Sequence, residues 1–265
     1  MKSLISAILI STLFLICSTS AQSLKEASPA EKKILSKPVR VIQSLLDQFG
    51  NNDWGEENTD NDDYQLLVPI DYNGSGPIPL SQNFERVYKV RENSKRFNTI
   101  LKPLYDKVQE LNSKYQEEYQ AIQSKSAKEQ EDFMSKSNPT MDSITTIGNK
   151  AEELNEIDVY AYINDDLING KPINDPDINV RGASLVTKLN HGYYQKDNWT
   201  SYFLAFGDWK NIKQNKEFNC YYYNFNKTKT ASIQNIVIVI TGAPDRMKEL
   251  MNKIDWSVLN KFLTQ

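Results

Sequence analysis

Few side chains in this sequence are suited to acid–base, nucleophilic or metal chemistry. Its single histidine, His191, lies in the polar segment NHG, and no Gly-x-Ser-x-Gly motif supplies a matching nucleophile. One histidine and two cysteines do not provide the ligand sets of familiar zinc or haem sites. We therefore expect no metal, no cofactor and no catalytic role for His191, and a non-enzymatic protein is favoured over an enzyme.

Carboxylates are the one abundant group with catalytic potential. Glycoside hydrolases use two carboxyl groups held roughly 5 to 9 Å apart, but the sequence does not indicate which two acids would meet. A carboxylate-dependent glycan hydrolase therefore stays open as an alternative function, with Asp208 in the segment FGDWK as the first acid to test. The aspartates near expected strand ends or loops are Asp158, Asp165, Asp166, Asp175, Asp177 and Asp208.

Aromatic residues are concentrated between residues 190 and 225. The stretch NHGYYQKDNWTSYFLAFGDWK, residues 190–210, holds two of the four tryptophans. Two interpretations stay open: these rings form the core of a sheet, with the long helix described below covering its second face, or some of them form an exposed platform for a sugar or an apolar ligand. The candidate ligand-binding residues are Tyr193, Tyr194, Trp199, Asp208 and Trp209.

The first 21 residues predict a secretory signal peptide. A basic start precedes an apolar run over residues 4–16, and small residues lead up to Ala21. We expect cleavage there and export to a periplasm or the extracellular space. A lipid anchor on Cys17 is disfavoured because the bulky Ile16 precedes it. No later segment is apolar over the length of a transmembrane helix, so a soluble protein is expected after cleavage.

Charge and cysteine content narrow the class of protein further. The formal net charge is −3 and the pI is near 5.4, so no overall basic field would attract nucleic acid. Cleavage would leave Cys220 as the only cysteine, which excludes an internal disulfide. Its strand-forming neighbours favour a small buried hydrophobic residue over a reactive thiol.

Residues 22–139 are expected to form a helical segment. Apolar spacing predicts a helix over residues 39–49, an acidic loop follows at residues 51–64, and helical character begins again at Asn83 in a long helix that ends at Asn138-Pro139. Heptad spacing marks a seam on this helix, whose partner could be a second copy, the first helix or the C-terminal domain. The candidate partner-binding residues are Phe97, Leu101, Leu104, Val108, Leu111 and Tyr115.

Residues 140–265 are expected to form an antiparallel α+β domain. Short polar connections between the strands favour antiparallel pairing. The unbroken run IVIVI at residues 236–240 predicts a central strand, and a helix beginning at Pro244 is expected to lie on the sheet and close the domain. The predicted strands are residues 157–163, 183–189, 202–206, 218–225 and 233–240.

The function that these features predict is that of an exported, non-enzymatic binding protein. Its partner would be a protein, reached through the long helix, or a glycan or apolar ligand, reached through the aromatic strands. Besides the glycan hydrolase, a structural or assembly factor that oligomerises through the long helix is an alternative.

Overall fold

A computed structural model describes most of the chain after the N-terminal segment, and gives the backbone alone at residues 24–26, 67–69 and 213–215. The expected signal peptide and Cys17 lie outside the described residues, so export stays a prediction. The described residues are 24–26, 28–48, 53–57, 67–69, 81–173, 175–189, 199–209, 213–215, 220–226, 228–229 and 232–264.

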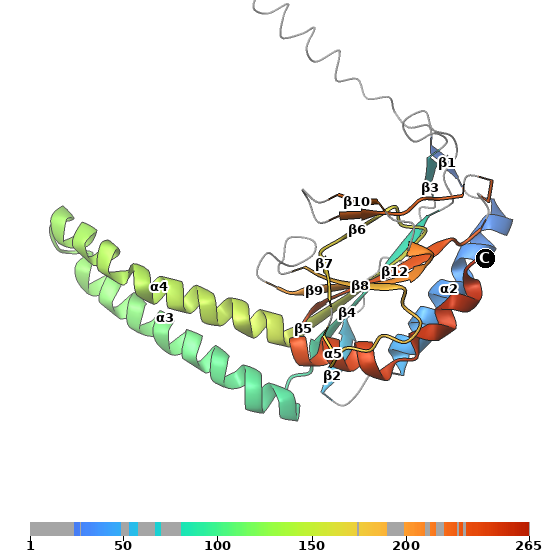
Figure 1. Cartoon of the computed structure of the whole chain (residues 1–265). Coiled ribbons are helices and arrows are strands. Elements are labelled where there is room, and N and C mark those ends of the chain that lie inside the picture. The colour runs from blue at the N-terminus through green and yellow to red at the C-terminus, as the bar shows by residue number, and fades with distance from the viewer. Residues whose placement is uncertain are drawn as a thin grey trace, which may run out of the picture.

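A large antiparallel sheet forms the centre of the molecule, with strand order β2-β4-β5-β12-β9-β8-β7 (Figure 1). The predicted α+β fold with a mainly antiparallel sheet is confirmed. The middle strand, β12, is buried at every residue, as its run of β-branched side chains predicts. The strands are β2 (Trp54–Glu57), β4 (Gln82–Val90), β5 (Glu156–Ile163), β7 (Lys171–Pro172), β8 (Leu185–Leu189), β9 (Ser201–Gly207) and β12 (Asn235–Gly242).

Three helices cover one face of this sheet. Side chains of Ile236, Ile238 and Ile240 on β12 pack in one apolar core with the helices. The first of the three begins ten residues before the helix predicted at residues 39–49, because Ser28 and Glu31 form a capping box at its start. The helices are α2 (Pro29–Asp47), α5 (Pro244–Lys253) and the 3₁₀ helix η3 (Trp256–Phe262).

Two smaller sheets accompany the large one. The pair β1 (Leu24–Glu26) and β3 (Leu67–Pro69) is antiparallel. The other small sheet has the order β10-β11-β6, and it contributes Ile168 and Tyr221 to a second apolar core with Val237 and Val239 of β12. This small sheet therefore covers part of the second face of the large sheet, a role that one of the two interpretations of the sequence gave to the long helix. Its strands are β6 (Leu167–Asn169), β10 (Lys213–Asn215) and β11 (Cys220–Tyr222).

The expectation that helical character begins at Asn83 is wrong. Residues 82–90 form β4, which pairs with β5 from Gln82 opposite Ile163 to Lys89 opposite Glu156. Phe84, Tyr88 and Val90 are buried on one face of this strand, at two-residue spacing from its start, and Val87 is buried on the other face. Charged residues on the opposite face of β4 hid this pattern within a polar stretch.

The long helix also ends earlier than predicted, and a second helix follows it. The π-helical turn η1 (Phe97–Leu101) continues into α3 (Lys102–Ile122), and α4 (Ala127–Asn155) runs back towards the sheet. Ser126 and Glu129 form a capping box at the start of α4, which passes through Pro139 without ending there. The domain boundary expected after residue 139 therefore falls inside a helix.

Candidate functional site

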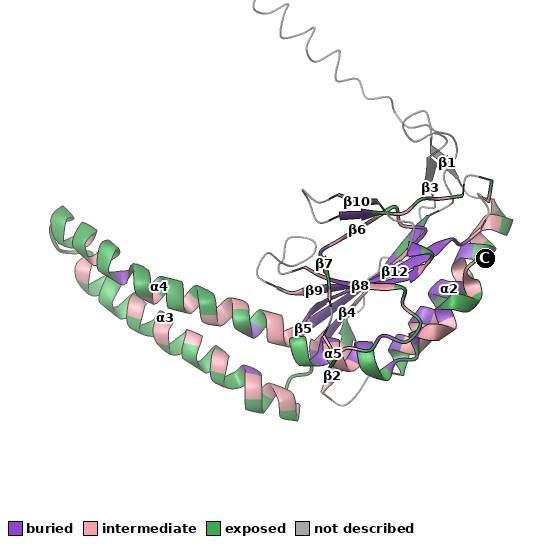
Figure 2. Ribbon diagram, in the orientation of Figure 1, coloured by how far each residue is buried: buried purple, intermediate pink, exposed green. Residues whose placement is uncertain are grey.

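The α3–α4 pair is a helical hairpin that projects from the sheet (Figure 1). Its longer helix, α4, has 29 residues and is therefore about 43 Å long at 1.5 Å per residue. No α3 residue is fully buried, and α4 buries only Ser137 and Ala151. Figure 2 shows this contrast between the mostly exposed hairpin and the buried strands. The hairpin is thus a thin arm with solvent on most of its surface.

The predicted heptad seam lies between the two helices of this hairpin. Leu101 is fully buried, and the other predicted seam residues are half-buried against α4. The Tyr115 and Phe133 rings meet across the seam with centroids 5.8 Å apart. The candidate partner-binding residues, namely Phe97, Leu101, Leu104, Val108, Leu111 and Tyr115, therefore have an intrachain partner, and a binding surface must be sought beside the seam.

Four large apolar side chains lie exposed directly beside the seam. Tyr105 and Tyr119 on α3 and Met134 and Met141 on α4 have exposed fractions from 36% to 48%. Each follows a seam residue by one position, which is the e position of the heptad on both helices. In an antiparallel pair the e positions of the two helices flank the same side of the seam. The four side chains therefore lie on one side of the hairpin.

This side of the hairpin carries no charge over most of its length. Between residues 105 and 123 of α3, its e and b positions are Tyr105, Gln109, Asn112, Gln116, Tyr119 and Gln123, and the next b position towards the base is Lys102. Between residues 134 and 148 of α4 they are Met134, Asn138, Met141, Thr145 and Gly148, while the b positions beyond this stretch, Glu131 near the tip and Glu152 near the base, are acidic. We call the uncharged residues among these the uncharged side. All are exposed except Gly148, which is half-buried.

The opposite side of the hairpin is strongly charged. Its ion pairs join Lys107 to Glu110 at 2.9 Å and Lys150 to Glu153 at 2.5 Å. The heptad pattern therefore divides the hairpin into a largely uncharged surface, which carries the exposed tyrosines and methionines, and a charged one. The charged g and c positions are Lys107, Glu110, Lys114, Glu117, Asp132, Lys136, Lys150 and Glu153.

Three aromatic rings hold the two helices together near the tip. Tyr115 and Tyr119 stack with their centroids 6.1 Å apart, and Phe133 of α4 lies 6.3 Å from Tyr119. The Tyr115 hydroxyl donates to the Met134 sulfur at 3.9 Å. These contacts fix the orientation of Tyr119 and Met134, so the exposed residues near the tip are presented on an ordered surface.

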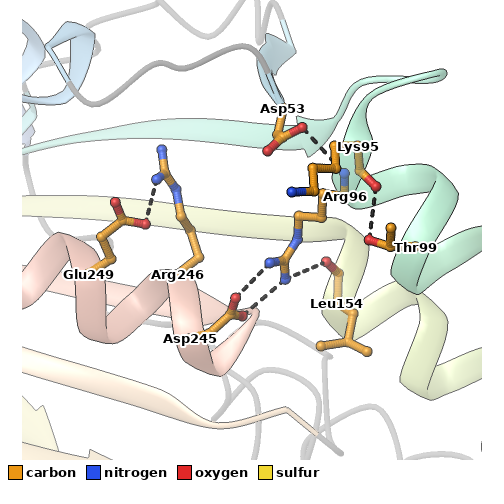
Figure 3. Close-up of polar contacts among 8 residues, drawn as sticks. All are labelled: Asp53, Lys95, Arg96, Thr99, Leu154, Asp245, Arg246 and Glu249. Atoms are coloured by element: carbon orange, nitrogen blue, oxygen red, sulfur yellow. Dashed lines mark hydrogen bonds and ion pairs between the residues drawn. The ribbon is translucent and has the colours of Figure 1, made fainter.

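Arg96 anchors the base of the hairpin (Figure 3). Its guanidinium donates to both carboxylate oxygens of Asp245 at 2.6 and 3.0 Å, and to the Leu154 carbonyl oxygen at 3.4 Å. It also lies 5.0 Å from the centre of the Trp54 ring. Burial alone would raise the pKa of Asp245, but the hydrogen bonds and charge of Arg96 hold it below its usual range. Arg96 thereby ties together the ends of α4, α5 and β2.

The predicted aromatic ligand site is not assembled by the described residues. Trp199 and Trp209 are both buried and lie beyond opposite ends of β9, so the two rings cannot stack on one sugar. The Trp209 indole N–H donates to the Phe206 carbonyl oxygen at 3.0 Å. Asp208 is exposed. The remaining candidates, Tyr193 and Tyr194, and also His191, lie outside the described residues.

Two aspartates have strongly raised pKa values, but they do not form a pair. Burial, followed by the charge of Glu85, raises the pKa of Asp158 to about 7. Burial also raises the pKa of Asp165 to about 7. Asp158 lies in β5, while Asp165 follows its far end, seven residues on, or about 23 Å along an extended chain. That separation is far too long for the two carboxyl groups of a glycosidase.

The described residues contain no cluster of three or more histidine, cysteine, aspartate or glutamate side chains suited to a metal ion. Within the same residues, no helix combines the length and apolarity needed to cross a membrane. Comparisons with protein-family models, curated proteins and solved structures gave no match.

Proposed function

We propose that this protein is an exported, non-enzymatic binding protein that holds a protein partner on the uncharged side of its hairpin. The observation that carries this proposal is the gathering of exposed tyrosine and methionine on one side of a projecting arm, over a stretch that carries no charge. The buried centres of protein interfaces are enriched in aromatic residues and methionine and depleted of charge. Export rests on the sequence of residues 1–21.

A protein partner fits the hairpin better than a small ligand does. The hollow at Trp199 has a volume of about 360 Å³ and is lined otherwise by polar α4 residues, among them Lys150 and Glu153. A site for an apolar ligand would instead be lined mainly by apolar side chains. The uncharged side is long and runs along both helices, as expected of a surface that another protein covers.

Site-directed photo-crosslinking tests this function. A photoreactive residue is placed at Asn112, on the uncharged side, or at its neighbour Ser113, which points away from the seam; both positions are exposed. Each variant is incubated with the exported proteins of the source cells. We expect a discrete product from position 112 that excess unlabelled protein suppresses, and none from position 113. Equal labelling from both positions, or no product, would rule out the uncharged side as the binding surface.

A further inference from the structure

We propose that the partner on the uncharged side is a second copy of this chain, so that two hairpins pair side by side in a four-helix bundle. This inference rests on the proposed function, because it names the occupant of the same surface. Most homo-oligomers are closed by two-fold axes, and a two-fold interface requires a patch that is complementary to itself.

The uncharged side meets this requirement because its exposed tyrosines lie on α3 and its exposed methionines lie on α4. A two-fold axis parallel to the hairpin places α3 of one copy against α4 of the other, with both tips at the same end. Tyr119 then lies within about one helical turn of Met134 of the second copy, and Tyr105 is similarly close to Met141 of that copy. Tyrosine and methionine side chains make favourable sulfur–aromatic contacts.

Charge favours this pairing over the other surfaces of the hairpin. Two copies that met through their charged sides in the same way would bring Lys114 close to Lys136 and Glu117 close to Asp132 of the second copy, and like charges repel. The uncharged side has no such conflict. A lipid surface is a poorer occupant, because interfacial helices place lysines beside their apolar stripe, whereas Lys107, Lys114, Lys136 and Lys150 lie on the opposite side of the seam and only Lys102, near the base, borders the uncharged side.

The size of the uncharged side indicates a weak, reversible dimer. It spans residues 105–123 of α3, which is about 28 Å at 1.5 Å per residue. Two helices side by side are about 20 Å wide, so the pairing buries roughly 1,100 Å² in total, close to the lower limit for specific interfaces. Dissociation in the micromolar range is therefore expected.

Sedimentation equilibrium on the purified exported chain tests this inference. From about 1 to 200 µM, we expect the average mass to rise from one copy towards two. The double variant Gln116→Glu/Met141→Glu places one charge on each helix of the uncharged side. The matched control, Gln120→Glu/Ser143→Glu, adds the same charge at exposed positions away from that side. We expect the first pair to weaken the dimer at least tenfold and the control to leave it unchanged.

A monomer at every concentration, or equal weakening by the two double variants, would overturn the inference. Circular dichroism spectra of both variants establish that each remains folded. The crosslinking experiment keeps the two proposals apart. If the purified protein is monomeric while position 112 captures a different exported protein, the binding function stands and the second copy is excluded as its partner. If neither experiment detects a partner, both proposals fail.

Discussion

Asp158 is almost fully buried in the large sheet, with only 1% of its surface exposed. It lies opposite Thr241 of β12 in the ladder, and Thr241 lies opposite Ser201 of β9. The Ser201 and Thr241 hydroxyls are 2.6 Å apart, so a polar row crosses three strands near one end of the sheet. Burial of a carboxyl group favours its neutral form. The stability that this row gives the folded protein should therefore depend on pH.

The pKa of about 7 for Asp158 predicts that stability falls as pH rises towards 8. Between about pH 4 and 7 the folded protein holds a proton that the unfolded chain has lost, so raising the pH favours unfolding. Asp165 acts in the same direction. We expect Asp158→Asn to raise the free energy of unfolding by about 1–2 kcal/mol at pH 8 and to change it little at pH 5.

Urea unfolding at pH 5 and pH 8 provides the measurement for Asp158→Asn. Asp177→Asn changes an exposed aspartate in the same way and serves as the control. Destabilisation by Asp158→Asn of equal size at both pH values would show that the carboxyl group is held by hydrogen bonds that asparagine cannot make.

Gly242 is the residue at which backbone conformation is most constrained. Its φ is +128°, and a Cβ atom added there would collide with the Glu156 carbonyl oxygen. Gly242→Ala is therefore expected to lower the free energy of unfolding by about 2–4 kcal/mol. Gly148→Ala is the matched control, because nothing lies within 4 Å of its added Cβ and alanine favours a helix by about 1 kcal/mol. Thermal unfolding of both variants measures this difference in stability. Equal changes in the two variants would contradict the role given to the backbone conformation of Gly242.

At the scale of elements, the hairpin depends on its seam along its length and on Arg96 at its base. The seam is mostly half-buried, so its packing alone gives each helix limited protection from solvent. Arg96 adds a two-pronged contact with Asp245 and a stacking contact with Trp54. Such a planar, forked contact cannot be reproduced by lysine.

Arg96→Lys is expected to loosen the base of the hairpin while keeping its charge. We expect a loss of about 1–2 kcal/mol in the free energy of unfolding and faster amide hydrogen exchange in η1 and the last turn of α4. Lys102→Ala removes only an exposed ion pair with Asp106 and should change stability by less than about 0.5 kcal/mol. Unchanged exchange at the base in Arg96→Lys would show that apolar packing alone fixes the hairpin.

From the sequence, the elements with a regular apolar pattern could be predicted better than the elements that pack against them. The sequence identified β12 and the seam from Phe97 to Tyr115, because period and β-branching are local properties. It missed α4 as the partner of that seam, since Thr140 and Ser137 occupy seam positions where apolar residues were expected. The surface that we propose for binding escaped notice because it lies one residue beside the seam, at positions such as Tyr119 and Met141.

At the scale of the whole molecule, the hairpin is an insertion between two neighbouring strands. β4 precedes it, β5 follows it, and these strands pair directly in the large sheet. The two connections between the sheet and the hairpin therefore lie side by side, at the end of β4 and the start of β5. Of the apolar core, only residues near the base of the hairpin, such as Leu101, belong to this insertion.

A shortened hairpin should leave the sheet folded. Removing residues 109–122 and 130–143 deletes two whole heptads from each helix, so the seam stays in register and the Ser126–Glu129 capping box is kept. We expect a cooperatively unfolding protein that no longer self-associates, measured by thermal unfolding and light scattering. Aggregation of the shortened protein would show instead that the outer part of the hairpin shields the sheet.

The direct pairing of β4 with β5 also determines how mechanical load would travel. Both strands leave the sheet for the hairpin at the same end, where Lys89 lies opposite Glu156. A pulling force on the hairpin therefore reaches both strands together and does not unzip one from the other. Instead, the force shears the pair against β2 on one side and against the seven-residue ladder with β12 on the other, where many hydrogen bonds must yield at once.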